Sequence, residues 1–274
     1  MSDRSLPECL YHYTDLAGLK GIIDSNSLWA THIRSLNDVS EILYSRGILA
    51  SLAKRLEQEF RSDVSSNIVL ELIELLSIAP TSPDTFVVAL CEDGDNLGQW
   101  RAYGGFAIGF NRERLAAVSQ FQEYSLIRII YDEGEQVRLL EGAIRESVPI
   151  MTEWLANPAD APSALMQGLL LGHGLTIAML WVKNSYFKDE REWRLARVFL
   201  PDEIDASTRM KSGVEIPYVE FSLSQDNVDS PIAEIITGPF ALSDASQKEI
   251  LEHLEAAGLE DVPIRSSSIP LRRS

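Results

Sequence analysis

Two glutamates and an arginine stand close together late in the chain, within residues 188–194 (KDEREWR). On a β-strand, Glu190, Glu192 and Arg194 share one face, because successive side chains alternate between the two faces. Two carboxylates on one strand face resist full burial unless they are ion-paired or functional. The segment is therefore either an edge strand with cross-strand ion pairs or a source of catalytic carboxylates. Trp193 inside the charged run argues against a purely solvated face.

A histidine near the start of the chain, His12, lies in a short strand expected over residues 9–14, just before a predicted helix. Thr14 or Asp15 is expected to cap that helix. A helix N-terminus presents free N–H groups and suits an anion, and a histidine there can donate a hydrogen bond to a ribose or a phosphate. The alternative is that His12 and Tyr13 simply pack the junction between strand and helix.

Two further clusters can also be interpreted either as structural or as ligand-binding. Asp38 and Glu41 have the spacing of a helix capping box, which needs no further explanation. Arg34 and Asn37 beside this helix start could instead line a ligand pocket.

The second of these clusters lies in a loop expected before a glycine-rich strand. It contains Trp100 and Tyr103, which either stack on a planar ligand ring or cover the core.

Several common chemistries have no motif in this sequence. It contains no phosphate-binding GxxxxGK[ST], no GxGxxG, no HExxH and no GxSxG, and the glycine-rich residues 104–109 precede a strand instead of opening a helix. The four histidines lack the spacing of metal ligands, so we expect no metal. A hydrolase built from His12, His32, Asp38 and Glu41 is a minor alternative.

Composition places the chain among folded globular proteins. Of 274 residues, 45% are hydrophobic and 24% charged, and 24 Lys+Arg against 41 Asp+Glu give a net charge of −17. This acidity argues against a general nucleic-acid binder or an anionic-membrane binder, since both need a basic face. It leaves room for a small nucleotide ligand or for one local basic pocket.

The expected compartment follows from the cysteines and from the apolar segments. Two cysteines and an N-terminus without a secretory signal predict a reducing, cytoplasmic context. Residues 164–182 are apolar enough to raise the question of a membrane span, but their polar groups favour a buried helix, interrupted at residues 172–174.

The elements that must position these residues follow no regular alternation of strand and helix. This order predicts an α+β fold with a largely antiparallel or mixed sheet, in a single domain over residues 1–274, with the helical block 133–182 as a candidate insertion. Strands are expected at 9–14, 28–31, 85–91, 106–110, 124–131, 190–200, 215–223 and 232–237. Helices are expected at 16–26, 38–60, 65–79, 133–155, 164–182 and 244–257.

The order of these clusters resembles a bacterial family catalogued as domain of unknown function 2971. Five features carry the resemblance, which runs from about residue 9 to residue 271. They are Leu10-Tyr11-His12-Tyr13-Thr14, Asn37-Asp38 with Glu41, Trp100 to Tyr103 before a glycine-rich strand, Glu190-x-Glu192-Trp193-Arg194, and Ser267-Ser268-Ile269-Pro270.

The first strand and helix also resemble, more distantly, the first motif of the ADP-ribosyltransferase superfamily. That resemblance implies a split, mostly antiparallel sheet with flanking helices, and NAD as the substrate. It implies that His12 holds a ribose of NAD, that Glu192 is catalytic and that Glu190 orients or accepts. Either Arg34 or Arg194 would then bind the pyrophosphate.

The site implied by this resemblance contains several further residues. The nucleotide-binding residues are expected to be His12, Tyr13, Thr14, Arg34, Asn37, Asp38, Trp100, Tyr103 and Arg194. The second-strand position remains open between Trp29, His32 and Arg34. The aromatic that stacks on nicotinamide remains open between Tyr44, Trp100 and Tyr103.

Two functions of different classes follow from the sequence. The first is an ADP-ribosyltransferase-like enzyme that cleaves the nicotinamide–ribose bond of NAD, as a bacterial toxin or phage-defence effector. Its acceptor is a protein side chain, a nucleic acid or water. The second is a non-catalytic module of related fold that senses a nucleotide or binds a protein, and the acidic surface favours a basic protein partner. Convergence of His12 with Glu190 and Glu192 in one place would favour the enzyme.

Overall fold

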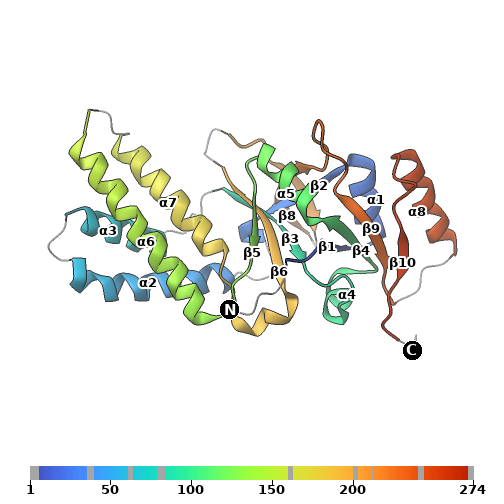
Figure 1. Cartoon of the computed structure of the whole chain (residues 1–274), viewed down its shortest axis with the longest axis horizontal. Coiled ribbons are helices and arrows are strands. Elements are labelled where there is room, and N and C mark those ends of the chain that lie inside the picture. The colour runs from blue at the N-terminus through green and yellow to red at the C-terminus, as the bar shows by residue number, and fades with distance from the viewer. Residues whose placement is uncertain are drawn as a thin grey trace.

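The computed structural model shows an α+β protein built on one ten-stranded open sheet with flanking helices (Figure 1). It describes residues 6–35, 40–60, 64–78, 84–159, 163–199, 203–211, 213–239 and 244–270. The strands are β1 (Cys9–Thr14), β2 (Ser27–His32), β3 (Thr85–Cys91), β4 (Phe106–Asn111), β5 (Ser125–Arg128), β6 (Glu192–Val198), β7 (Ser207–Lys211), β8 (Val214–Ser222), β9 (Ile232–Thr237) and β10 (Ile264–Ser266).

Eight α-helices and two 3-10 turns appear in the described residues. They are α1 (Leu16–Ser25), α2 (Ser40–Phe60), α3 (Val64–Ile78), α4 (Leu97–Tyr103), α5 (Arg112–Phe121), α6 (Glu133–Ala156), α7 (Ala164–Leu180), α8 (Asp244–Ala256), η1 (Ile33–Ser35) and η2 (Ser185–Glu190). The strand pairs are antiparallel except β10 with β9, which is parallel, so the expected mixed, mostly antiparallel sheet is confirmed.

The sheet divides into two arms at β3. One edge of β3 pairs with β6 over its whole length. On the other edge, β1 pairs only at Cys91, through Tyr11, and β2 pairs only at Val87 and Phe86. One arm continues from β1 through β4 and β9 to β10, and the other continues from β2 through β8 to β7. The two arms therefore leave β3 from opposite ends of one edge.

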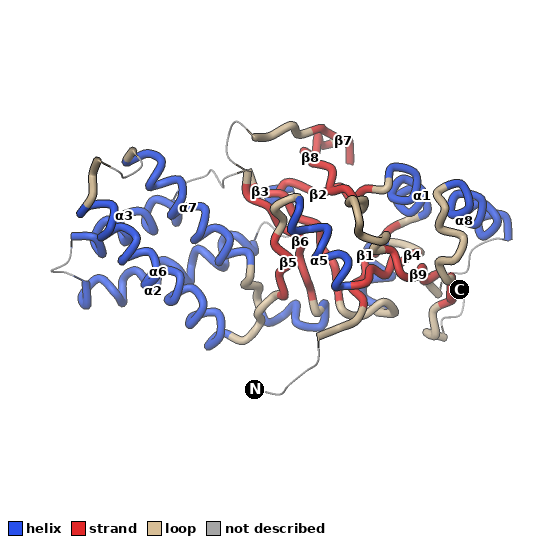
Figure 2. The backbone as a smooth tube through the Cα atoms, turned by 45° about the horizontal axis from the view of Figure 1, so that its top comes forward, coloured by secondary structure: helices blue, strands red, loops and turns tan. Residues whose placement is uncertain are grey.

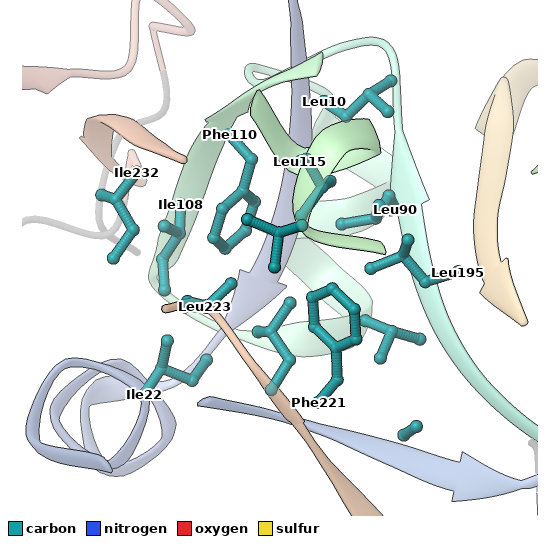
Figure 3. Close-up of a cluster of buried hydrophobic side chains, with 14 of the residues drawn as sticks. Leu10, Ile22, Leu90, Ile108, Phe110, Leu115, Leu195, Phe221, Leu223 and Ile232 are labelled. Carbon is teal, nitrogen blue, oxygen red and sulfur yellow. The ribbon is translucent and has the colours of Figure 1, made fainter. Parts of the chain in front are cut away.

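The main core fills one face of this sheet. Side chains from both arms meet there, including Leu10, Phe110 and Phe221, and Leu115 of α5 packs on them (Figure 3). Burying a side chain of this size stabilises the fold by about 2–3 kcal/mol. Helices α1 and α8 close this core at its outer end.

A lobe of four helices, α2, α3, α6 and α7, lies at the other end of the molecule and has a hydrophobic core of its own (Figure 2). The helical block expected at 133–182 corresponds to α6 and α7, and it packs against α2 and α3. No helix among the described residues is both long and apolar enough to cross a membrane.

Several local predictions agree with the structure because their signals are local. Asp15 caps α1 by accepting a hydrogen bond from the Gly18 N–H at 2.8 Å. Asn26 ends the same helix in the left-handed conformation, with φ of 48°. One detail was wrong: α7 runs without interruption through residues 172–174.

Candidate functional site

The strand β3, in the middle of the sheet, has one exposed residue, Ala89. The other residues of β3 are buried, but Ala89 is exposed although its strand is paired on both edges. Its face of the sheet is covered beside Cys91 by Trp100 of α4, and beside Val87 by Leu180 of α7. Ala89 lies between these two covers, at the point where the arms separate. We call Ala89 and the side chains of His12, Thr31 and Arg209 near it the fork opening.

The His12 imidazole is hydrogen-bonded to the backbone of Ala89. Its Nδ1 lies 3.0 Å from the Ala89 carbonyl oxygen, in a bond exposed to solvent. Because a carbonyl only accepts, Nδ1 carries the proton, and the neutral ring then keeps Nε2 as an acceptor. The protein packed around the ring lowers the pKa of His12, and the charge of Arg209 lowers it further. At neutral pH His12 therefore offers one free acceptor nitrogen.

Arg209 reaches the fork opening from β7. Its Nη2 donates a hydrogen bond to the Thr31 hydroxyl at 3.0 Å. Its guanidinium carbon lies 5.3 Å from the Trp29 ring and 5.9 Å from the Tyr218 ring. These two rings stack on each other with their centroids 4.3 Å apart. The Arg209 charge is thus held against aromatic rings, an arrangement that attracts the cation to the ring faces.

The predicted carboxylates form a buried ion cluster next to this opening. The Glu192 carboxylate accepts hydrogen bonds from Lys183 Nζ at 2.8 Å and from Arg194 Nε at 2.6 Å. Lys183 also donates to Glu190 at 2.7 Å, and Glu190 is half-exposed. Burial alone would raise the pKa of Glu192, but Arg194 and Lys183 outweigh it and hold that pKa below its ordinary value. Glu192 is therefore ionised at neutral pH.

The strand register brings the histidine and the glutamates to one region. Ala89, whose carbonyl binds His12, pairs with Arg194 across β3 and β6, and Cys91 pairs with Glu192. Paired residues share a face, so the ion cluster lies on the same face as Ala89, one strand away. His12 and Glu192 are 180 residues apart in sequence, and strand pairing places each of them against β3.

Tyr13 and Trp100 have structural partners instead. The Tyr13 hydroxyl donates to the Asp93 carbonyl at 2.7 Å, and its ring packs edge-on against Trp100 at 4.6 Å. Trp100 is buried, and its Nε1 donates to Asp95 at 2.9 Å. Asp95 also accepts from the Ser268 N–H at 2.7 Å, which fastens the C-terminal segment. These contacts favour the structural interpretation of both aromatics.

The remaining predicted residues are placed as follows. Thr14 ends β1, and its hydroxyl lies against α1 where only the glycine at position 18 leaves room for it. Tyr103 is exposed at the end of α4, and Arg34 is exposed in η1. Asn37 and Asp38 lie outside the described residues.

The candidates for the two open positions differ in their surroundings. Among the second-strand candidates, Trp29 contacts Arg209, while His32 is buried and accepts the Arg34 N–H on Nδ1. Tyr44 donates to the Gln136 side chain in the helical lobe.

The sequence did not reveal Arg209, Thr31 or Tyr218 as members of a site. Strand β7 was missed because its five residues are mostly exposed and show no apolar alternation. One signal was present: residues 206–214 contain a basic pair and no acid, which is unusual in so acidic a chain.

Comparison with known families gives one match. Residues 99–195 match a family model described as a protein of unknown function (DUF2971). The match runs from α4 to β6, so it includes Trp100 and the Glu190-x-Glu192-Trp193-Arg194 motif, and it supports the resemblance over that part of the chain. No curated protein and no solved structure matches the chain. Among the residues that the structure describes, no group of His, Cys, Asp or Glu side chains could hold a metal ion.

Proposed function

We propose that this chain binds a nucleotide in the fork opening, with NAD as the expected ligand, and that it cleaves the nicotinamide–ribose bond as an ADP-ribosyltransferase-like enzyme. One observation carries the proposal. His12 and Glu192, far apart in sequence, are placed along the two edges of β3, at the exposed Ala89 and at Cys91 two residues away. Nothing local in the sequence would bring these groups together, and a purely structural sheet centre would be covered.

His12 is suited to bind a ribose. Its neutral ring presents Nε2 as an acceptor, and a ribose hydroxyl is a donor. The lowered pKa keeps this acceptor available at neutral pH. The exposed Ala89 beside it leaves space for the sugar.

The glutamates are suited to the chemical step. When the bond between nicotinamide and ribose breaks, its electron pair leaves with nicotinamide and positive charge develops on the ribose ring. A carboxylate near that carbon stabilises the charge. The acceptor then gives an electron pair to the ribose carbon, and its proton passes to a carboxylate or to water. Glu190 is half-exposed and fits the proton transfer, while ionised Glu192 fits the electrostatic role.

A second candidate function rests on the ion pairs of Glu192. Its carboxylate is neutralised by both Lys183 and Arg194, so little of its charge is left to stabilise a developing cation. This observation favours a module that binds the nucleotide without cleaving it. The two candidates share the binding site and differ only in turnover.

Calorimetric titration with NAD, with nicotinamide release followed in parallel, tests the proposal. We expect saturable binding by the wild type, loss of binding in His12→Ala, and loss of release with retained binding in Glu190→Gln. Glu192→Gln is a second test where it folds, since it disturbs a buried cluster. His253→Ala is the matched control, because His253 pairs with Asp24 on α1, away from β3.

Binding without nicotinamide release in the wild type would support the non-catalytic module. Absence of binding by well-folded wild type at millimolar NAD would overturn both candidates.

A further inference from the structure

We infer that Arg209 is the receptor for a phosphate group of the ligand, and that Trp29 and Tyr218 hold its guanidinium in place. This inference rests on the proposed function, because the phosphate would belong to the nucleotide in the fork opening. It replaces the expectation that Arg34 or Arg194 binds the pyrophosphate.

The first argument is that Arg209 has no counter-ion. Among the described residues no carboxylate pairs with it, and its buried Nε has no hydrogen-bond partner. The only hydrogen bond it makes within that part of the chain is to the Thr31 hydroxyl. An arginine has five N–H donors, so most of its donors are free for a ligand. Burial lowers the pKa of Arg209, as expected for a cation without compensation.

The second argument is the contrast with the other arginines near the sheet. Arg194 donates to Glu192, Arg197 donates to Glu123, and Arg265 donates to Glu234. Arg209 differs from these three arginines in having no acid partner among the described residues. Glu220 is opposite Trp29 in the strand register, yet it makes no ion pair with Arg209. A half-buried cation without a partner costs free energy, and a bound anion offsets this cost.

The third argument is the position of Arg209 relative to His12. Thr31, which binds Arg209, pairs with Val87, and His12 binds Ala89 two residues further along the same strand. Two residues of β-strand span roughly 6–7 Å, which is the scale of one nucleotide sugar with its phosphate. A hydroxyl acceptor and an anion receptor held at strand positions this far apart match a ribose phosphate in scale. The Trp29 side chain beside Arg209 is 43% exposed and offers aromatic surface to a planar ring.

Arg194 cannot serve as this receptor in the same way. It is only 2% exposed, and its Nε and Nη2 donate to Glu192. A phosphate would have to displace this carboxylate. Arg209 needs no such displacement.

The test compares AMP with adenosine, which have the same base and ribose and differ in the phosphate. Calorimetry on the wild type should show AMP binding at least about tenfold more tightly than adenosine, as one charge-assisted contact implies. Arg209→Gln should remove this preference and leave adenosine binding unchanged. Arg209→Lys, which keeps the charge but loses the planar fork, should keep part of the preference.

Arg197→Gln is the matched control. Arg197 also lies over an aromatic ring, 4.3 Å from the Phe199 centroid, but its charge is paired with carboxylates. This variant should keep the wild-type preference for AMP. If the wild type binds both compounds equally, or if Arg209→Gln retains the preference, the inference is wrong while the proposed function stands.

Absence of binding for adenosine, AMP and NAD alike would instead overturn the proposed function. Inorganic pyrophosphate then tests Arg209 alone. Binding that is lost in Arg209→Gln would support the anion receptor without a nucleotide, and absence of binding by the wild type would overturn it.

Discussion

The fork opening and the buried ion cluster differ in how their charges are compensated. Ala89 and the ion cluster lie on one face of the sheet, one strand apart. In the ion cluster, Glu192 is shared by Lys183 and Arg194, so each buried charge has a partner. In the fork opening, Arg209 has no acid partner among the residues that the structure describes, and Ala89 is exposed. The balanced charges of the ion cluster support the fold, whereas the uncompensated charge of Arg209 is available to a ligand.

The comparison also explains why motif residues do not all belong to the site. Tyr13 and Trp100 belong to a third region, the joint around Asp95 that ties β1, α4 and the C-terminal segment together. Their hydrogen bonds are complete within the fold. In the fork opening, by contrast, a ligand would accept hydrogen bonds from donors that have no partner in the described part of the fold.

Removing the shared carboxylate should give the largest effect. Glu192→Ala leaves Lys183 and Arg194 buried without their common partner, and we expect the free energy of unfolding to fall by roughly 3–5 kcal/mol. Denaturant unfolding followed by circular dichroism measures this loss. Glu190→Ala is the control, since its half-exposed carboxylate should cost about 1 kcal/mol or less. Equal losses in the two variants would contradict the distinction between them.

The stability that the Glu192 ion cluster gives to the wild type should depend on pH. The pKa of Glu192 is lowered in the fold from its ordinary 4.5, so its stabilisation is present above pH 4.5 and is lost as the pH falls through the lower folded value. Unfolding curves for the wild type and Glu192→Gln should therefore differ most above pH 4.5 and approach each other in more acidic solution. A difference that stays constant down to strongly acidic pH would show that charge is not the cause.

The joint at Asp95 should contribute less. Trp100→Phe keeps most of the buried ring but loses the Nε1 hydrogen bond to Asp95, and we expect a loss of about 1–2 kcal/mol in the free energy of unfolding. NAD affinity should change less than about twofold in this variant if Trp100 is structural. A large loss of NAD affinity with unchanged stability would show that Trp100 belongs to the binding site.

The smallest effect on stability is expected at Arg209. Arg209→Gln removes a cation that no acid in the described part of the chain compensates, so the free energy of unfolding should stay within about 0.5 kcal/mol of the wild type or rise. Thermal unfolding of Arg209→Gln beside Arg197→Gln measures this directly, and Arg197 should be the more costly of the two. A strong destabilisation by Arg209→Gln would show that its charge supports the fold.

Sequence reasoning predicted those parts of the fold whose causes are local. The ends of α1 follow from Asp15 and Asn26, and the limits of β9 were predicted at 232–237 as observed. The type of sheet was predicted as well. The strand β7 and the helices α4 and α5 were missed, because short elements give too little periodicity to stand out.

The site was harder to predict because its causes are distant. Glu190 and Glu192 were expected to be paired or functional, but Lys183 as their partner depends on how α7 meets β6. The fork opening depends on the registers of β1 and β2 on β3, which join residues 54 to 80 positions apart. The pattern of residue types along one strand does not indicate its register on another strand. The enzyme and the binding module therefore remain proposals that share one site.

The central claim is that the fork opening binds a nucleotide, and NAD titration of the wild type, His12→Ala and Arg209→Gln tests it most directly. We predict saturable binding by the wild type, weaker binding by both variants, and wild-type binding by Arg197→Gln. Binding that is unchanged in both His12→Ala and Arg209→Gln would place the nucleotide elsewhere. Absence of binding by the folded wild type at millimolar NAD would contradict the account.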